Sequence, residues 1–303
     1  MEITSDWHIH TQNSCDSACM TIQELITRAE EEGMADFGIS DHIHTPYNLP
    51  DLTASRKEWE ACTPGDHFHF GVEVSCVSRW EIEQIAAGKH DTPKYGVRQG
   101  GPVNGPLAIG LTSEELETHG VEYVIGGAHW PMYVPMEREA VIRDYHRQNM
   151  FLATHPLVDI VAHPWWWMGH WQNGDGSYTT GPLLDDFGQI PQSMHQEFAA
   201  AVRENGTVVE INLDAMLLSQ CYPELFKRQY TEYLKTLESA GVSLSIGSDC
   251  HGAHYESDFV KASAMLDEVG INKEALWRLG PGHRPRPGKT LATEQSIPPI
   301  FGA

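Results

Sequence analysis

Short apolar runs rich in β-branched residues alternate along the chain with longer segments of helical periodicity. This alternation is typical of parallel strands joined by helical crossovers, because two parallel strands need a long connection. We expect seven strands, over residues 3–10, 35–42, 68–75, 123–129, 160–163, 208–213 and 243–249. Seven such strands are enough to close a sheet on itself, so the pattern predicts an α/β fold of the barrel type.

Two of the connecting helices have clear boundary signals. The helix expected over 21–32 starts with Thr21, followed three residues later by Glu24 in the capping-box spacing, and it stops at Gly33. The second is expected over 223–239. Three stretches break the rhythm and are expected to be long loops inserted at one end of the barrel: 45–66, 88–112 and 165–192.

Composition and charge limit the possible partners. The chain of 303 residues is 41% hydrophobic and 20% charged, a balance typical of globular proteins, and no apolar run approaches the roughly 20 residues that span a bilayer. The net charge of −22 opposes binding to a phosphate backbone. We therefore expect a small-molecule substrate and neither a nucleic-acid nor a membrane partner. A single domain over 1–280 is expected, followed by a tail rich in Pro and Gly over 281–303, and the oligomeric state stays open.

The six cysteines have neither paired CxxC spacing nor the density of a secreted disulfide framework. The first residues, MEITSDWHIHT, lack the basic and apolar regions of a signal peptide. These features predict a cytoplasmic protein with free thiols.

Six of the seven expected strands have His, Asp or Glu at or close to their carboxyl ends. Because strand side chains alternate in direction, His8 and His10 share a face, and so do Asp249 and His251 if the last strand continues that far. The carboxyl ends of barrel strands meet at one mouth. We expect nine side chains to meet there: His8, His10, Asp16, His42, Glu73, His129, His163, Asp249 and His251.

These residue types indicate which ions the mouth binds. Imidazole and carboxylate ligands without thiolate suit Zn, Mn or Fe, whereas Ca and Mg do not need so many histidines. Nine ligands exceed the needs of one ion, so we expect two or three divalent transition metals with a bridging carboxylate. Such a centre activates water and stabilises the entering and leaving oxygens of a displacement, which is the chemistry of hydrolysis.

In this order, from His8 to His251, the motifs resemble the PHP family, named for polymerase and histidinol phosphatase domains. The resemblance implies a distorted seven-stranded β/α barrel with a trinuclear metal site. It implies one metal held by His8, His10, Glu73 and Asp249, a second held by Glu73 as the bridge with His129 and His163, and a third held by Asp16, His42 and His251. The position of Asp16 is His in some members and Asp in others, so a dinuclear site is the alternative.

The resemblance and the ligand pattern together predict a metal-dependent hydrolase. We expect a phosphoesterase that cleaves a small phosphorylated metabolite with a metal-bound hydroxide, with Glu73 and Asp249 as catalytic residues. One alternative is a carboxylic ester, amide or lactone hydrolase using the same ions, which a Trp-rich and Arg-poor mouth favours. The other is a PHP module that binds without catalysis, although such a module would be expected to have lost several ligands.

Four side chains are expected to bind substrate. Arg79 and Arg98 are the arginines that the strand pattern places near the mouth, and the planar guanidinium group suits phosphate. Trp165 and Trp166, with Trp167, directly follow His163. Three consecutive side chains cannot share one face, so we expect at least one of these rings to cover the substrate.

Five further residues lie beside the motifs. Asp41 should point to the opposite face from His42 and serve packing or hydrogen bonding, and Cys250 should point away from its neighbouring ligands. Glu210 and Asn212 share a face and either line the mouth or hydrogen-bond within the barrel. His44 repeats the spacing of the first histidine pair and stays an unassigned candidate.

Overall fold

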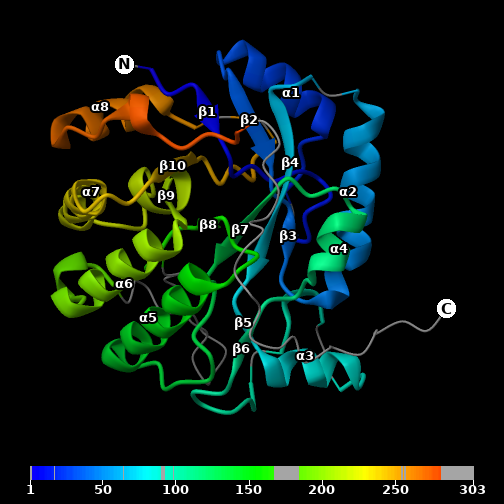
Figure 1. The fold of residues 1–303 in the computed structure, drawn as a ribbon, viewed down its shortest axis with the longest axis vertical. Coiled ribbons are helices and arrows are strands. Elements are labelled where there is room, and N and C mark those ends of the chain that lie inside the picture. The colour runs from blue at the N-terminus through cyan, green and yellow to red at the C-terminus, as the bar shows by residue number, and fades with distance from the viewer. Residues whose placement is uncertain are drawn as a thin grey trace.

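The computed structural model describes residues 2–280 except 17, 64, 90–92, 98, 167–183, 254 and 256. Its main sheet is parallel throughout (Figure 1). The strand order is β1 (Ser5–Asp6), β2 (Asp36–Ile39), β4 (Phe68–Ser75), β7 (Tyr123–Gly127), β8 (Ile160–Val161), β9 (Val208–Asn212) and β10 (Leu244–Gly247). The short strand β3 (His42–Ile43) also pairs with β4, beyond the end of β2.

The first and last strands of this order meet and close the sheet. The backbone nitrogen of Trp7 donates to the carbonyl oxygen of Ile246 at 3.0 Å, and that of His10 donates to Cys250 at 3.1 Å. Ile9 and Cys250 form an isolated parallel bridge. The sheet is therefore a distorted seven-stranded barrel, as the sequence predicts.

Eight described helices lie outside the sheet (Figure 1). They are α1 (Ile22–Glu31), α2 (Leu49–Ala61), α3 (Arg79–Ala86), α4 (Ser113–Thr118), α5 (Arg138–Thr154), α6 (Gln192–Asn205), α7 (Glu224–Ser239) and α8 (Phe259–Val269). Short 3₁₀ turns are η1 (Pro46–Asn48), η2 (Pro93–Tyr95), η3 (Phe187–Gln189) and η5 (Lys273–Ala275), and η4 (Leu213–Leu217) is a π-helix. The small antiparallel pair β5 (Val77–Ser78) and β6 (Leu107–Ala108) follows β4.

The two predicted helices are confirmed as α1 and α7. Thr21 and Glu24 form the expected capping box, and Gly33 follows with φ of +77°. The expected loop over 45–66 is wrong, because it contains η1 and the thirteen-residue helix α2. Pro50 lies in the first turn of α2, where proline is tolerated because the first backbone N–H groups have no helical partner.

The other two expected loops have different outcomes. Residues 88–112 contain η2 and β6 and are otherwise irregular where the structure describes them. Most of 165–192 lies outside the described residues, as does the expected tail over 281–303. Within the described part of the chain, no helix combines the length and the apolar character needed to cross a membrane.

Tyr123 fills the middle of the barrel. Its hydroxyl group lies 2.8 Å from the carbonyl oxygen of Trp7 and 2.9 Å from that of Ile39. A Cβ atom at Gly38 or Gly71 would overlap with the Tyr123 ring, so these two positions need glycine for space. Because the Tyr123 ring fills the middle of the barrel, the inward positions at the carboxyl ends of the strands are left for polar side chains.

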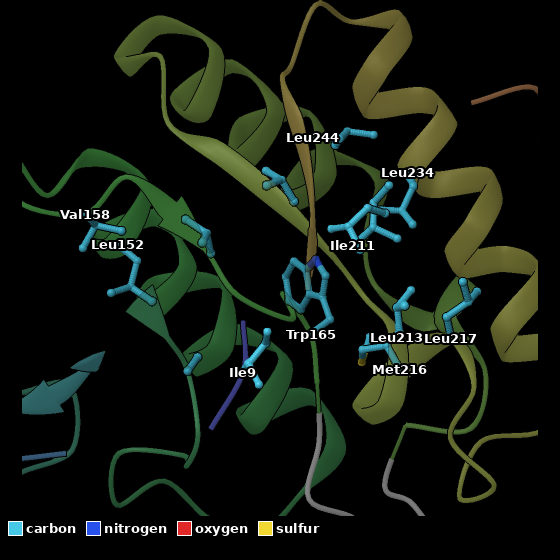
Figure 2. Packing of buried hydrophobic residues seen from close by; sticks show 14 of the residues in the cluster. Ile9, Leu152, Val158, Trp165, Ile211, Leu213, Met216, Leu217, Leu234 and Leu244 are labelled. Atoms are coloured by element: carbon cyan, nitrogen blue, oxygen red, sulfur yellow. The ribbon is translucent and has the colours of Figure 1, made fainter. Parts of the chain in front are cut away.

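A large apolar core surrounds the barrel wall. Figure 2 shows part of it, where Trp165 lies among Ile9, Ile211 and Met216, each of which is buried. Full burial of one such aliphatic side chain contributes about 1.5–3 kcal/mol to folding. The core therefore holds the strands that carry the mouth in fixed positions.

Several strands are shorter than the sequence predicts, and two of them end just before a proposed ligand. The expected strand 160–163 ends at Val161, and the last expected strand ends at Gly247. His163 and Asp249 then have positive φ angles of +28° and +59°. Such angles are uncommon for residues other than glycine and are concentrated at functional sites.

Candidate metal centre

All nine predicted ligands come together at the carboxyl ends of the strands. Three groups have ligand atoms within 4.8 Å of one another: His8, His10 and Asp249; His10, Asp16, His42 and His251; and His42, Glu73 and His129. The ninth residue, His163, has its Nε2 atom 3.1 Å from Oε1 of Glu73. The convergence follows from strand alternation, while metal binding by these residues stays a prediction.

Glu73 lies at the centre of the cluster and is fully buried. Its Oε1 atom is 3.1 Å from Nε2 of both His129 and His163. Its Oε2 atom is 2.7 Å from Nδ1 of His42, 3.2 Å from Nε2 of His8 and 3.6 Å from Nε2 of His10. Each carboxylate oxygen thus faces a different set of histidines, which is the arrangement that a carboxylate bridging two ions needs.

A glycine on the neighbouring strand makes room for this centre. A Cβ atom at Gly127 would lie 2.6 Å from Oε1 of Glu73 and 2.6 Å from Cε1 of His129. Both distances are too short for real Cβ contacts. The small residue at the end of β7 therefore lets Glu73 and His129 meet.

The outer part of the cluster lies nearer to solvent. Oδ2 of Asp16 forms ion-pair contacts with Nε2 of His42, at 3.0 Å, and with Nε2 of His251. The side chain of His251 is 34% exposed and that of Asp16 is 18% exposed, whereas His8 and His10 are fully buried. The cluster is therefore accessible from the side of His251.

Several buried ligand atoms have no hydrogen-bond partner among the described residues. They are Nε2 of His8, His10 and His129, Nδ1 of His42 and Oε2 of Glu73. Leaving a buried polar atom unpaired costs about 1–3 kcal/mol, so such atoms are rare in folded proteins. Their convergence fits divalent ions, and the absence of sulfur atoms from the described cluster fits Zn, Mn or Fe.

The protonation states suit cation binding in part of the cluster. Burial, together with the neighbouring His251 and His42, lowers the pKa of His10 to about 3, and burial lowers the pKa of His129 to about 4. Burial would raise the pKa of Glu73, but the surrounding histidines hold it well below its usual range. Neutral imidazole and ionised carboxylate are the forms that bind metals.

The pKa of His42 is raised, in contrast to the lowered pKa values of His10 and His129. Burial would lower its pKa, but Glu73 and Asp16 raise it to about 10. A divalent ion between these carboxylates would take the place of that proton. Metal binding would therefore release protons.

Other polar side chains support the ligands, and sequence reasoning left most of them open or missed them. Of the two alternatives for Glu210 and Asn212, the structure shows hydrogen bonding within the barrel. Sequence reasoning missed Ser75, whose hydroxyl group lies 2.8 Å from Nδ1 of His129 and 2.6 Å from Nδ1 of His44. The signal for Ser75 was its position two residues after Glu73 on the same strand face.

The expectations for Asp41 and Cys250 are confirmed. Asp41 accepts hydrogen bonds from the backbone nitrogen of Thr11 at 2.6 Å and from the hydroxyl groups of Thr11 and Ser55. Cys250 packs in the hydrophobic core. Neither side chain belongs to a group of possible ligands among the described residues.

The predicted substrate-binding residues are scattered. Arg79 is exposed at the first position of α3, and Arg98 lies outside the described residues. Trp166 is partly buried, with its ring centroid 4.9 Å from that of His163. The expectation for Trp165 needs correction: it is 1% exposed and packs in the core beside His146 (Figure 2). A φ of +73° at Trp165 turns the chain, so these adjacent rings point in different directions.

Two further aromatic rings lie beside the cluster. The ring of Trp130 is 5.2 Å from that of His129 and 4.9 Å from that of His44. Tyr95, which is 36% exposed, is 5.7 Å from His44. With Trp166, these residues form an aromatic rim, and sequence reasoning missed Trp130 although it directly follows a proposed ligand.

A family model described as PHP domain matches residues 6–249, and the chain therefore belongs to the PHP family. A protein of Shewanella pealeana named probable phosphatase is 26% identical over 290 residues, covering 93% of this chain and 90% of that protein. A protein of Tolumonas auensis with the same name is 23% identical over 283 residues, covering 93% of this chain and 92% of that protein.

The fold has a counterpart among solved structures. The crystal structure of a candidate histidinol phosphatase from Listeria monocytogenes superposes with a TM-score of 0.52 at 12% identity. The match covers 82% of this chain and 96% of that chain. At this identity the likeness shows a shared fold, here the distorted β/α barrel.

Proposed function

We propose that the protein is a metal-dependent phosphoesterase that cleaves a small phosphorylated metabolite. The observation that carries the proposal is the position of Glu73, whose two oxygens face separate sets of buried histidines. Membership of the PHP family and the names of the phosphatase relatives support the same reaction class.

In this proposal, one ion is held by His8, His10, Glu73 and Asp249, a second by Glu73, His129 and His163, and a third by Asp16, His42 and His251. Two or three Zn, Mn or Fe ions bound there would activate water and stabilise charge on the phosphoryl oxygens. The third site is the one that a dinuclear enzyme would lack.

In this proposal, the residues of the site have different roles. Glu73, fully buried, would hold two ions and helps to exclude solvent from the floor of the site. Asp249, which is 9% exposed, faces His10 from the more open side, so we assign it to orient the reacting water. Arg79 and Arg98 are proposed to bind the phosphate group, and Trp166 to cover the rest of the substrate.

The aromatic rim favours a second candidate function. Trp130 and Trp166 beside His129, with Tyr95 beside His44, suit a planar or apolar substrate group. A carboxylic ester, amide or lactone hydrolase could use the same ions with such a rim. A PHP module that binds a ligand without catalysis is the third hypothesis.

A substrate screen distinguishes these functions. Purified protein supplied with Mn or Zn is assayed on phosphomonoesters, phosphodiesters and carboxyl esters. If the protein is a phosphoesterase, it should hydrolyse a phosphate ester. Arg79→Ala should then lower kcat/KM by about 10 to 1000-fold without changing the metal content. Turnover of carboxyl esters alone, with a raised KM for Trp166→Ala, would support the second function. Protein that binds metal normally but hydrolyses none of the three classes would reject both.

A further inference from the structure

We propose that Glu210 and Asn212 form a positioning unit that assembles the metal centre. Both residues lie on β9, and together they contact proposed ligands from three other parts of the barrel: His8, His163 and Asp249. This inference rests on the proposed function, because it explains how that centre is held together.

The strand arrangement explains why the unit is on β9. Among the seven expected strands, the one over 208–213 is the strand without a proposed ligand at its end. In the barrel, β9 pairs with β8 on one side and with β10 on the other. Its inward side chains at the mouth therefore lie between ligands from its neighbours. Glu210 and Asn212 occupy these positions, and both are almost fully buried.

Glu210 uses both carboxylate oxygens within the protein. Oε1 lies 2.6 Å from Nδ1 of His8. Oε2 accepts hydrogen bonds from the backbone nitrogen of His163 at 2.7 Å and from Nδ2 of Asn212 at 3.0 Å. The carboxylate is therefore occupied by donors, and we infer that Glu210 supports the metal ligands instead of being one.

The contact with Glu210 determines which nitrogen of His8 can bind a metal. A carboxylate accepts but does not donate, so Nδ1 of His8 must carry the proton. In the neutral ring, which is the form that binds a metal, Nε2 then carries the lone pair, and it lies 3.2 Å from Oε2 of Glu73 and 3.5 Å from Oδ1 of Asp249. A carboxylate behind a histidine ligand orients the ring in this way in many metal sites.

Asn212 extends the same support to Asp249. Its Nδ2 atom donates to Oδ2 of Asp249 at 3.0 Å, and its Oδ1 atom accepts from the backbone nitrogen of Ala215 at 2.9 Å. The second contact determines the orientation of the amide, because only the oxygen can accept. Asp249 is thus held through Oδ2, while Oδ1 faces the Nε2 atoms of His8 and His10.

Gly247 provides independent evidence that the contact between Glu210 and His8 needs the space beside the end of β10. A Cβ atom there would overlap with Oε1 of Glu210 and would lie 2.6 Å from Cβ of His8. Gly247 is not among the described residues with positive φ, so its backbone does not require glycine. Space for the contact between Glu210 and His8 is the remaining reason for a glycine at the end of β10.

The test is Glu210→Gln, which keeps the shape of the side chain. An amide has one accepting oxygen, so it must place its NH₂ group either against Nδ1 of His8 or against the donors from His163 and Asn212. The first orientation moves the His8 proton to Nε2, and the second creates donor–donor contacts. We expect metal affinity, measured by competition of bound Zn or Mn with a chelator, to fall about 10 to 100-fold.

Melting temperatures separate positioning from simple stability. A purely structural role would lower the Tm of chelated and metal-loaded protein equally, whereas positioning reduces the rise in Tm that metal produces. Asp159→Asn is the matched control, because Asp159 is a buried carboxylate that accepts from the backbone nitrogen of Val124 at 2.9 Å, at the other end of β8. It should leave metal affinity unchanged. If Glu210→Gln does not fold, Asn212→Leu provides the same test with an expected loss of about 10-fold.

The outcomes for the two proposals are distinct. Wild-type protein that binds metal, together with a folded variant of wild-type affinity and an unchanged metal-induced rise in Tm, overturns the positioning role alone. Wild-type protein that binds less than one equivalent of metal overturns the proposed function and the positioning role with it. Weaker affinity in the variant, with an unchanged Asp159→Asn control, supports both.

Discussion

Strand β4 contributes one residue to each of two groups of histidine and carboxylate side chains, His69 near its start and Glu73 near its end. The base cluster consists of His69, Asp36 and Glu122, and both ring nitrogens of His69 are hydrogen-bonded to carboxylates at 3.0 Å. The mouth cluster consists of the nine proposed ligands around Glu73. There, ring nitrogens that face the carboxylates are buried without hydrogen bonds to the described residues.

The difference shows how to separate a structural ion pair from a candidate metal site. One histidine between two carboxylates can satisfy every atom with its own protons. Six histidines around three carboxylates, packed from several strands, cannot all do so, and ring nitrogens remain aimed at shared oxygens. The base cluster is therefore satisfied without an ion, whereas the unpaired atoms of the mouth cluster fit bound divalent ions.

Chelation should have the largest effect and should act on the mouth cluster alone. We expect the purified protein to contain at least two equivalents of transition metal, because the two oxygens of Glu73 face separate sets of histidines. A chelator should abolish turnover and lower the Tm by on the order of 10 °C, since ligands bound at 1,000 times their Kd contribute about 4 kcal/mol each. Elemental analysis of untreated protein checks this, and active protein with less than one equivalent would contradict it.

The next effect compares one glutamate from each cluster. Glu73→Ala should remove bound metal and lower kcat/KM by about 1000-fold or more, because a bridging carboxylate holds two ions that each stabilise transition-state charge. Glu122→Gln, in the base cluster, should leave metal content and turnover unchanged. Metal analysis and kinetics on both variants test the contrast. Full metal content in Glu73→Ala would show that the bridging assignment is wrong.

A smaller effect is expected at the open side of the mouth cluster. His251→Ala removes a partly exposed side chain that pairs with Asp16 and Asp249 and stacks on the ring of His10. We expect the variant to lose the third ion and retain the first two, which metal titration by calorimetry would count. Loss of all bound metal would mean that the sites are not separable, and no change would favour a dinuclear centre.

The fold and the convergence of the ligands were predictable because both follow from short-range rules. Strand alternation places His8 and His10 on one face, and parallel strands bring their carboxyl ends together. The exact strand ends were not predictable. Asp249 and His251 meet the cluster although β10 ends at Gly247, because a positive φ at Asp249 redirects the chain.

The errors in the site have the same physical origin. Trp165 follows a ligand in sequence, yet a single left-handed residue conformation turns it into the core. Ser75 and Glu210 touch proposed ligands from strands other than their own, so their partners depend on how the strands pair and how the barrel closes. A single sequence shows which residue types lie on a face, but it does not show which partner across the barrel each one meets.

The smallest predicted effect concerns the base cluster and its response to pH. Burial by itself would lower the pKa of His69, but hydrogen bonds to Asp36 and Glu122 raise it to about 9. Two arginines also lie nearby: Nη1 of Arg278 is 3.8 Å from Oδ2 of Asp36, and Arg56 contributes to lowering the pKa of Glu122. The hydrogen bonds from His69 to the two carboxylates outweigh burial, so the protonated ring is favoured in the folded state.

The sign of the pH effect follows from the raised pKa. A histidine that binds its proton more tightly when folded stabilises the protein fully below its unfolded pKa of about 6.5, and this contribution is lost as pH rises through the folded value. His69→Gln should therefore lower the free energy of unfolding by about 1–2 kcal/mol at pH 6 and by much less at pH 10. Urea unfolding of chelated protein at both pH values measures the difference. An equal loss at both would show that His69 acts through packing against Trp7 instead of through charge, and a loss of bound metal in His69→Gln would remove the distinction between the two clusters.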